Sequence, residues 1–443
     1  MFAAIWAFLV WIAPYVISAA VAMGIGYLGG KLFEQDYKQP PSPSGDSQSR
    51  SWMPHTTERE GSPHPRAYGR NMHHGNIIAK WTDVSNEERE ILHMIIEHGD
   101  GPTQGIGSNV VYLNDQPVGN FTDVNVQERL GTMDQAVMTG FEKTKLEYEI
   151  GTELIFEVEQ TFTTPNDFFD DIEYTLMWPN GFFKYQKDGD QKSSGVSVKV
   201  RISETGLNNW TTVFNEMIWG NSIDPIFKLY KLSTLGFTCT LGKQYDLEFS
   251  RLSEKGERHY NDVFIKSVRE VVNVAFAYPG KAMIGIRAVA TTQLSGNVDI
   301  KVIREDRLVN VWNGTAWTIQ YSRNRAWVVF DILTQPVISG NGGGLPYVIE
   351  RYEGLDPMYL DLAFFYEWAQ WCAYQIPDGY GGVEDRMPCD VIIDFQTDIW
   401  TFAIDAAEVG RTHLYWCGPS LTGWIDKAIN EVIDLVTVDN IMA

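Results

Sequence analysis

The first thirty residues carry no charged side chain, and Lys31 is the first charge in the chain. About 20 consecutive apolar residues suffice for a helix to cross a bilayer. Residues 1–34 are therefore predicted to form an apolar helical segment. It is either a membrane anchor, kinked at Pro14, or a plug that packs against copies of itself and enters a membrane later, since Ala and Gly let helices approach closely. A secretory signal fits less well, because no basic residue precedes the apolar run.

Three glycines in this segment, Gly24, Gly26 and Gly29, spell G-x-G-x-x-G. A dinucleotide site needs a strand before this motif, a helix after it and an acidic residue about 20 positions further on. The sequence here has an apolar run before the motif and a Pro- and Ser-rich stretch after it. Close packing of small residues explains the glycines better, and we predict no cofactor.

The charge balance is strongly acidic, with 35 Lys and Arg against 57 Asp and Glu and a net charge of −22. Such a surface does not bind nucleic acid by neutralising phosphates. Apolar residues make up 44% of the chain, which is enough for buried cores and excludes wholesale disorder. At 443 residues the chain is long enough for several domains.

The chain divides by composition into four parts and is expected to be an α+β, multidomain protein. Residues 1–34 are the apolar segment, and residues 35–76, rich in Pro and Ser, form a linker. Residues 77–320 are strand-rich, with an inserted β domain near 140–270, and residues 321–443 form an α+β domain.

Hydrophobic spacing and turn residues predict individual elements within these parts. We expect strands over 196–202 and on both sides of the Asn313-Gly314 turn, and a hairpin over 146–162 around Gly151. Helices are expected over 87–96, around 362–373, around 399–406 and over 424–436.

No catalytic or metal motif stands out. His64, His73 and His74 lie in or beside the linker without a partner at metal-ligand spacing. Cys372, Cys389 and Cys417 form no C-x-x-C pair, and whether they meet in space stays open. The pairs Asp170-Asp171 and Glu384-Asp385 are of the type that a glycan hydrolase needs, but acidic pairs arise by chance in so acidic a chain. We therefore predict no catalytic, cofactor or metal residues and a protein that is not an enzyme.

A series of short sequence motifs resembles one protein family. Leu92–Gly105 and Val111–Val118 resemble the N-terminal part of the tip attachment, or central hub, proteins of long-tailed, lambda-like phages. The same order continues in later segments. These are residues 126–135, 196–201, 278–286, 311–315, 324–336, 377–386 and 389–418. Residues 61–75 also resemble a glycine- and proline-rich word of other tail-tip proteins.

The resemblance implies a structural protein at the tail tip of a virion. Hubs of this family form a homotrimer that closes the tail tube and opens as a channel for DNA ejection. Implied partners are tube and distal tail proteins, the tape measure protein and fibre proteins. DNA would pass through the lumen without specific binding, and residues 1–30 would contact the host membrane.

Family members extend several hundred residues further than this chain, so a second hub chain is also implied. The alternatives that stay open are a tail-associated peptidoglycan or glycan hydrolase and a membrane-anchored bacterial protein.

Overall fold

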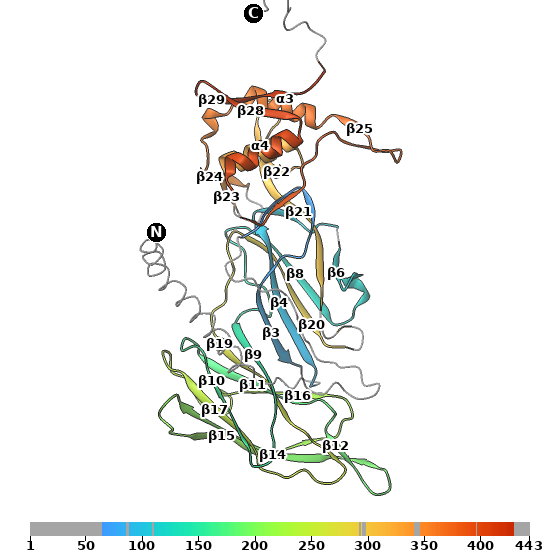
Figure 1. The fold of residues 1–443 in the computed structure, drawn as a ribbon, viewed down its shortest axis with the longest axis vertical. Coiled ribbons are helices and arrows are strands. Elements are labelled where there is room, and N and C mark those ends of the chain that lie inside the picture. The colour runs from blue at the N-terminus through green and yellow to red at the C-terminus, as the bar shows by residue number, and fades with distance from the viewer. Residues whose placement is uncertain are drawn as a thin grey trace, which may run out of the picture. The chain divides into compact units, whose positions relative to one another are not determined.

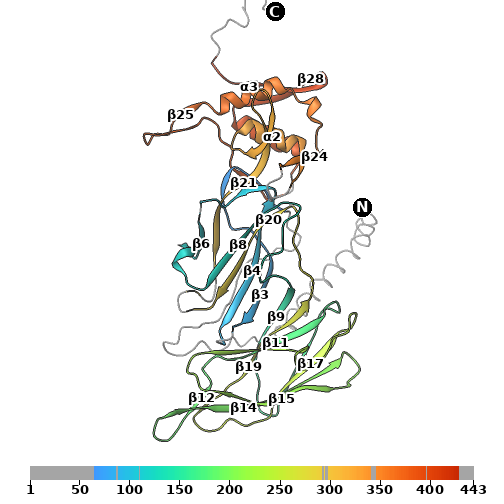
Figure 2. The ribbon, with the colours of Figure 1, turned by 180° about the vertical axis from the view of Figure 1, so that it is seen from behind.

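The computed structural model describes residues 64–428, except 86–87, 109, 292–293, 295–297, 341–345 and 396. Within these residues the chain is mostly β-strand, with α-helices gathered toward the C-terminal end (Figures 1 and 2). The expected apolar helical segment 1–34, most of the linker and residues 429–436 of the last expected helix lie outside the described residues. Among the described residues, no helix has the length and apolar character needed to cross a bilayer.

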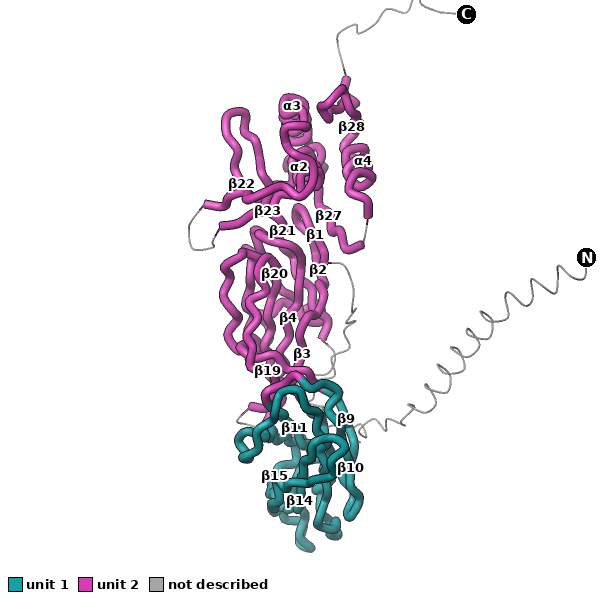
Figure 3. Tube along the Cα trace, turned by 90° about the vertical axis from the view of Figure 1, so that its left-hand side faces the viewer, with its two compact units in different colours: residues 1–49, 148–167, 171–269 teal, residues 50–147, 168–170, 270–443 magenta. Residues whose placement is uncertain are grey.

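The described chain divides into two compact units, coloured separately in Figure 3. Unit 1 contains residues 148–167 and 171–269, and unit 2 contains residues 64–147, 168–170 and those from 270 onward. Unit 1 is thus an insertion in the sequence of unit 2.

Unit 1 is a β-sandwich built largely of two antiparallel four-stranded sheets. One sheet has the order β10 (Glu159–Thr163), β17 (Tyr245–Arg251), β14 (Ser194–Glu204) and β15 (Thr211–Gly220). The other has the order β16 (Ile226–Lys231), β11 (Asp171–Trp178), β19 (Phe264–Val272) and β9 (Thr144–Glu153), of which the first residues of β9 and the last of β19 belong to unit 2. A small sheet joins β13 (Gln191–Lys192), β12 (Phe183–Tyr185) and β18 (His259–Tyr260).

Aromatic contacts join the two large sheets. The Tyr174 ring on β11 meets the Phe249 ring on β17 at 5.3 Å between centroids, and Phe214 on β15 meets Tyr230 on β16 at 4.8 Å. Along β14 the residues alternate between buried and half-buried, as expected for a strand with one face in the core. The strand predicted over 196–202 is therefore confirmed.

Unit 2 contains a second pair of sheets. The first has the order β3 (Asn76–Val84), β4 (Glu90–Asp100), β20 (Lys281–Val289) and β8 (Val124–Leu130). The second has β2 (Arg70–His73), β21 (Ile300–Trp312), β6 (Val111–Leu113) and β7 (Gln116–Pro117), with β5 (Thr103–Gly105) and β22 (Trp317–Tyr321) also pairing with β21. A one-turn 3-10 helix, Val118–Asn120, follows β7. Buried residues of β4, β20, β6 and β21 share one apolar cluster.

Three local predictions are wrong. The helix expected over 87–96 falls largely on strand β4, whose first ten residues are all buried. A strand covered on both faces lacks the two-residue alternation by which strands are recognised. Residues 146–162 are not a hairpin, because β9 pairs with β19 and β10 with β17, in different sheets. Trp424, expected to begin a helix, lies in strand β29 (Ser420–Ile425).

The end of the expected linker also differs from the structure. Residues 66–68 form β1 and residues 70–73 form β2. β1 pairs with β27 (Val391–Ile393), and β2 pairs with β21. These partners are more than 200 positions away in the sequence, so local composition gave no sign of them. The hairpin at Asn313-Gly314 is confirmed by the pairing of β21 with β22.

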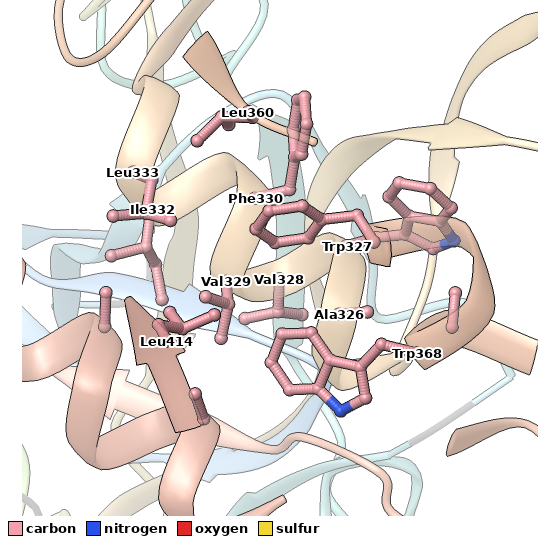
Figure 4. Close-up of a cluster of buried hydrophobic side chains, with 14 of the residues drawn as sticks. Ala326, Trp327, Val328, Val329, Phe330, Ile332, Leu333, Leu360, Trp368 and Leu414 are labelled. Atoms are coloured by element: carbon pink, nitrogen blue, oxygen red, sulfur yellow. The ribbon is translucent and has the colours of Figure 1, made fainter. Parts of the chain in front are cut away.

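Residues 323–428, which we call the C-terminal subdomain, pack around one helix of unit 2. This helix, α2 (Arg325–Thr334), begins at Asn324, whose side chain accepts a hydrogen bond from the Ala326 amide, and all its residues from Ala326 on are buried. It packs in one cluster with α3 (Leu362–Cys372) and α4 (Ile399–Val409), which confirms the two helices expected there. Figure 4 shows Trp327, Phe330 and Trp368 within this core.

Short strands and one 3-10 helix complete the subdomain. They are β23 (Pro336–Ser339), β24 (Val348–Tyr352), the 3-10 helix Pro357–Tyr359, β25 (Gln375–Pro377), β26 (Val383–Asp385), β27, β28 (Thr412–Cys417) and β29. Six of these strands form two-stranded antiparallel sheets: β23 with β24, β25 with β26, and β28 with β29. Strand β27 pairs with β1.

A buried ion pair connects α2 to the strands of unit 2. Arg307 on β21 donates to Asp331 on α2 through Nε at 3.0 Å, and the hydroxyl of Tyr68 on β1 donates to the same carboxylate oxygen at 2.7 Å. The other Arg307 nitrogens donate to the carbonyls of Gly101 and Pro336. Burial and the adjacent Asp331 carboxylate raise the pKa of Tyr68, so the phenol stays a donor. The three side chains fix α2 against β21 and β1.

Removing the Asp331 carboxylate is expected to destabilise unit 2 strongly. The variant Asp331→Ala leaves the Arg307 guanidinium buried without its counter-ion, a change that costs about 3–5 kcal/mol. Urea denaturation measures the free energy of unfolding. The matched control is Asp426→Ala, which breaks the exposed Arg411–Asp426 pair and should cost no more than about 1 kcal/mol. Equal effects of the two substitutions would contradict this account.

A polar layer in unit 2 consists of buried side chains from β4, β2 and β21. His98 on β4 is 1% exposed, and neither of its ring nitrogens has a hydrogen-bond partner among the described residues. Its ring meets that of His73 on β2 edge-on at 5.5 Å, and His73 Nε2 lies 2.8 Å from Asp306. Arg304 on β21, wholly buried, is the other charged neighbour. Burial, then Arg304 and His73, lower the pKa of His98 well below its usual range.

This layer predicts acid sensitivity of unit 2. His98 stays neutral in the folded state while the unfolded chain binds a proton near the usual His pKa of about 6.5, so stability falls as the pH drops below that value. Each pH unit costs up to about 1.4 kcal/mol for each histidine held neutral. Melting temperatures between pH 7.5 and 5 should therefore decline less in His98→Met than in the unmodified protein.

Two other histidines matter for the interpretation of that experiment. His93 retains part of the acid effect in the His98→Met variant, because burial lowers its pKa to about 4. His74, largely exposed beside Asp299, provides the control: His74→Gln should keep the pH profile of the unmodified protein. Superimposable profiles for His98→Met and the unmodified protein would refute the role given to His98.

Candidate assembly surface

The histidines considered as metal ligands do not converge. His64 Nδ1 lies 2.8 Å from Glu97, His73 pairs with Asp306, and His74 lies 3.4 Å from Asp299. Each ring thus has a different carboxylate as its partner. Within the part of the chain that the structure describes, no group of three or more His, Cys, Asp or Glu side chains is arranged to hold a metal ion.

The cysteines separate into two environments. Cys372 and Cys389 are buried in the core of the C-terminal subdomain, and burial raises the pKa of both thiols, to about 12 for Cys372. Cys417 is exposed at the end of β28, and all three thiols are free. The three therefore do not share one site, and the two buried thiols are poor nucleophiles because they stay protonated.

The acidic pairs serve local structure. Asp170 accepts from the backbone amide of Asn273, and Asp171 accepts from the amide and hydroxyl of Ser233. Glu384 and Asp385 are successive residues of strand β26, so their side chains point to opposite faces. Glu384 and Asp385 therefore do not face a common site as hydrolase carboxylates must.

What the C-terminal subdomain does present is exposed aromatic surface on the β28–β29 hairpin. One face of the hairpin is buried through Leu414, Leu421 and Ile425. On that face a Cβ at Gly423 would lie 2.4 Å from the Phe364 ring of α3, so only glycine lets the hairpin pack this closely.

The opposite face of the hairpin points outward. His413 pairs with Trp424, Tyr415 with Thr422 and Cys417 with Ser420, so these side chains share it. Trp424 is 53% exposed and Tyr415 44%. Trp416, whose register partner is Leu421, stacks its ring on that of Trp400 of α4, with 6.3 Å between the ring centroids. We call the outward side chains of residues 413, 415, 417, 420, 422 and 424 the hairpin face.

A second exposed feature is the β25–β26 hairpin, residues 375–385, which we call the arm. In Figures 1 and 2 it extends away from the body of the subdomain. Its base is held by Arg386, whose guanidinium lies 4.4 Å from the Tyr374 ring centroid and 4.9 Å from that of Trp371. The backbone bonds from Arg386 to Tyr374 and from Met387 to Cys372 continue this anchor.

The tip of the arm is an ordered turn that presents one tyrosine. Asp378 Oδ1 accepts from the amides of Tyr380 and Gly382 at 2.8 and 2.9 Å. Gly379 and Gly381 have positive φ angles, which glycine adopts without strain. Tyr380, between them, is 97% exposed.

Arm and hairpin face together are suited to binding protein rather than to chemistry. Exposed Tyr and Trp are the side chains that most often dominate protein interfaces, because they bury much area and lose little conformational entropy. Sequence reasoning missed both surfaces. The turn residues Asp378-Gly379 and Gly381-Gly382 were a local signal for the arm, but only the fold shows which aromatic rings stay uncovered.

Loss of Arg386 is expected to loosen the arm without unfolding the subdomain. A cation–π contact contributes about 0.5–1 kcal/mol at an exposed site, and Arg386 makes two. In Arg386→Ala, limited proteolysis should cut within 375–385 faster, while the melting temperature changes little. Arg351→Ala, which removes an exposed arginine of β24 that pairs with Glu353, is the control. Unchanged cleavage in Arg386→Ala would show that the stack does not hold the arm.

Comparison with known proteins gives one consistent relationship. Residues 144–274 match the family model of the FNIII-A domain of tip attachment protein J, and this range encloses unit 1. Tip attachment protein J of Escherichia phage SECphi27 is 25% identical over 349 residues, which cover 72% of this chain and 27% of that protein. The protein of the same name from Escherichia phage SECphi4 is 22% identical over 376 residues, 78% of this chain and 31% of that protein.

The resemblance to tip attachment proteins is thereby confirmed, and with it the expected location at the tail tip of a virion. The chain spans between a quarter and a third of the length of these relatives. Similarity to solved structures is too weak to indicate the fold or the function. A chain of the structure described as "X-ray structure of the entire lipid-containing bacteriophage PM2" has a TM-score of 0.19 and 9% sequence identity to this chain. That match covers 53% of this chain and 75% of the other chain.

Proposed function

We propose that this chain, a relative of the tip attachment proteins of tailed phages, is a structural component of a phage tail tip that forms a trimeric central hub. The hub closes the tail tube and opens as a channel for DNA ejection. The relationship to tip attachment protein J over 72% of the chain is the observation that carries this proposal.

The described residues support a role in assembly. The two acidic pairs serve local structure, and the candidate histidines are each paired with a different carboxylate. The arm and the hairpin face instead offer aromatic side chains to partners. Closed cyclic assemblies need such self-complementary or paired surfaces on every copy. In a tail tip these surfaces would contact other copies, tube and distal tail proteins, fibre proteins or a second hub chain.

The charge of the chain fits a duct for nucleic acid. With a net charge of −22, a lumen lined by this protein repels phosphates rather than holding them. DNA then slides through without specific binding. Three copies of the apolar residues 1–30 would bundle in the lumen or tip as a plug that is hidden from water, and would reach the host membrane on release.

A purified preparation of the full chain should contain a trimer. Light scattering coupled to size-exclusion chromatography is expected to give three times the mass of the 50.2 kDa chain. Electron microscopy should show rings with three-fold symmetry at the tail end of the particle. A monomer at every accessible concentration, or turnover of peptidoglycan in a zymogram, would overturn the proposal.

Deletion of residues 2–30 separates assembly from ejection. Tails carrying this deletion are expected to assemble, because the Pro- and Ser-rich linker sequence separates this segment from the strand-rich part of the chain. DNA release into cells should fall sharply, measured by potassium efflux and by infectivity per particle. Tails with a deletion of equal length that is refilled by a Gly and Ser linker are the control for spacing. Full infectivity of the deletion mutant would exclude a role of this segment in ejection.

A further inference from the structure

Strands β14 and β15 are neighbours in one sheet of unit 1 and present one face outside the sandwich core (Figure 1). On β14 the valines at 196, 198 and 200 are buried in the core, so the residues between them lie on the outer face. Directly opposed residues of paired strands share a face. The outer face therefore carries three opposed pairs, which are Gly195 with Trp219, Ser197 with Met217, and Lys199 with Asn215.

Gly195 lets the Trp219 ring lie against the sheet. A Cβ at position 195 would lie 3.0 Å from Cζ3 and 3.1 Å from Cε3 of that ring, and 3.1 Å from Sδ of Met217. The indole and the thioether thus both lean over Gly195, where a larger residue would crowd them. Trp219 is nevertheless 60% exposed. The sheet supports one side of the indole, and most of the remaining ring surface is open to solvent.

The groups around Trp219 on this face are polar and mostly uncharged. Ser197 and Asn215 project from the same face, and both can donate and accept hydrogen bonds. Just beyond the end of β15, the amide nitrogen of Gln191 donates to the amide oxygen of Asn221 at 3.1 Å. Four residues of a strand span about 13 Å, so Trp219 and Asn215 mark the ends of a strip rather than a single point.

One cation on this face is not neutralised by the chain itself. Arg201 pairs with Glu159 and Glu248. Lys199, the next outward residue of β14, makes no ion pair within the part of the chain that the structure describes. Its three ammonium hydrogens are therefore available to oxygen atoms of a ligand.

We propose that this face of unit 1 binds an oligosaccharide, with one pyranose ring stacked on Trp219 and hydroxyls of adjoining sugars hydrogen bonded to Ser197, Asn215 and Lys199. A pyranose carries C–H groups on its faces and hydroxyls around its rim. The C–H groups pack on the electron-rich face of an indole, and the hydroxyls require donors and acceptors beside it. A strip about 13 Å long fits several linked sugars better than one.

A protein partner fits this face less well. Aromatic hot spots of protein interfaces are surrounded by further contacts that exclude water. On the outer face of residues 195–201 and 215–219, Met217 is the one apolar side chain beside Trp219. The free edge of β15 is also unsuited to a further strand, because Glu216 lies opposite the buried Val198 and is an inward-pointing charge at that edge.

Saccharide binding by the full chain tests this site. The probes are maltohexaose, cellohexaose and chitohexaose, and a titration by saturation-transfer NMR detects weak binding. At least one probe is expected to bind, with the strongest transfer to the C–H hydrogens of its rings. Trp219→Ala should weaken that binding about tenfold, the effect typical of removing an aromatic stacking surface. Trp219→Phe should retain part of the binding. Since Trp219 is 60% exposed, both variants should keep the melting temperature.

Two further variants separate the site from a general effect of losing an indole. Trp424→Ala removes a tryptophan of similar exposure from unit 2 and should bind like the unmodified protein. Gly195→Val keeps the indole of Trp219 but crowds its place on the sheet, and should weaken binding.

Equal binding by Trp219→Ala and the unmodified protein, or no binding of any of the three probes, would overturn the saccharide site. Loss of self-association in Trp219→Ala without saccharide binding would likewise overturn it and assign the face to a protein partner. Saccharide recognition by unit 1 goes beyond the hub function and does not depend on it. A monomeric chain that binds a probe through Trp219 would uphold the site while overturning the trimeric hub.

Discussion

The buried contact of Arg307 and Tyr68 with Asp331 is the interaction on which the order of unit 2 depends. Strand β21 belongs to the sandwich, α2 is the centre of the C-terminal subdomain, and one carboxylate receives donors from both β21 and β1. Taking these charges out of water is costly, and the cost is offset only when every partner is in place. The pair therefore favours a single packing of helix against sheet. The direction in which the subdomain presents its arm follows from that packing.

The aromatic residues of this subdomain divide between two tasks. Trp327, Phe330, Phe365 and Trp368 fill the core around α2, whereas Trp424, Tyr415 and Tyr380 stay exposed. The proposed role in a ring would use both kinds, since a rigid core holds interface residues in position. The polar layer at His98 adds pH dependence to the stability of unit 2.

Strands, turns and helices were predictable from the sequence where their pattern depends only on residues close together in the chain. The alternation of Val196–Ile202, the Asn313-Gly314 turn and the helical spacing after Leu362 all depend on neighbours within a few residues. The errors share a different cause. Strand β4 is buried on both faces and so lacks alternation, and β1 and β2 exist because distant strands pair with them. Strands β9 and β10 do not form the hairpin predicted around Gly151, because β9 pairs with β19 and β10 pairs with β17 in a different sheet.

The sequence by itself determined the family resemblance, the acidic surface, the strand-rich character and the lack of a catalytic motif. These properties depend on composition and on short sequence motifs that occur in the same order along the chain as in the family. Only the tertiary structure decided that His73 pairs with Asp306, that Cys417 separates from the buried thiols, and that Tyr380 stands at the end of an anchored arm. Burial and exposure of a side chain depend on which distant segments cover it, and no local pattern encodes that.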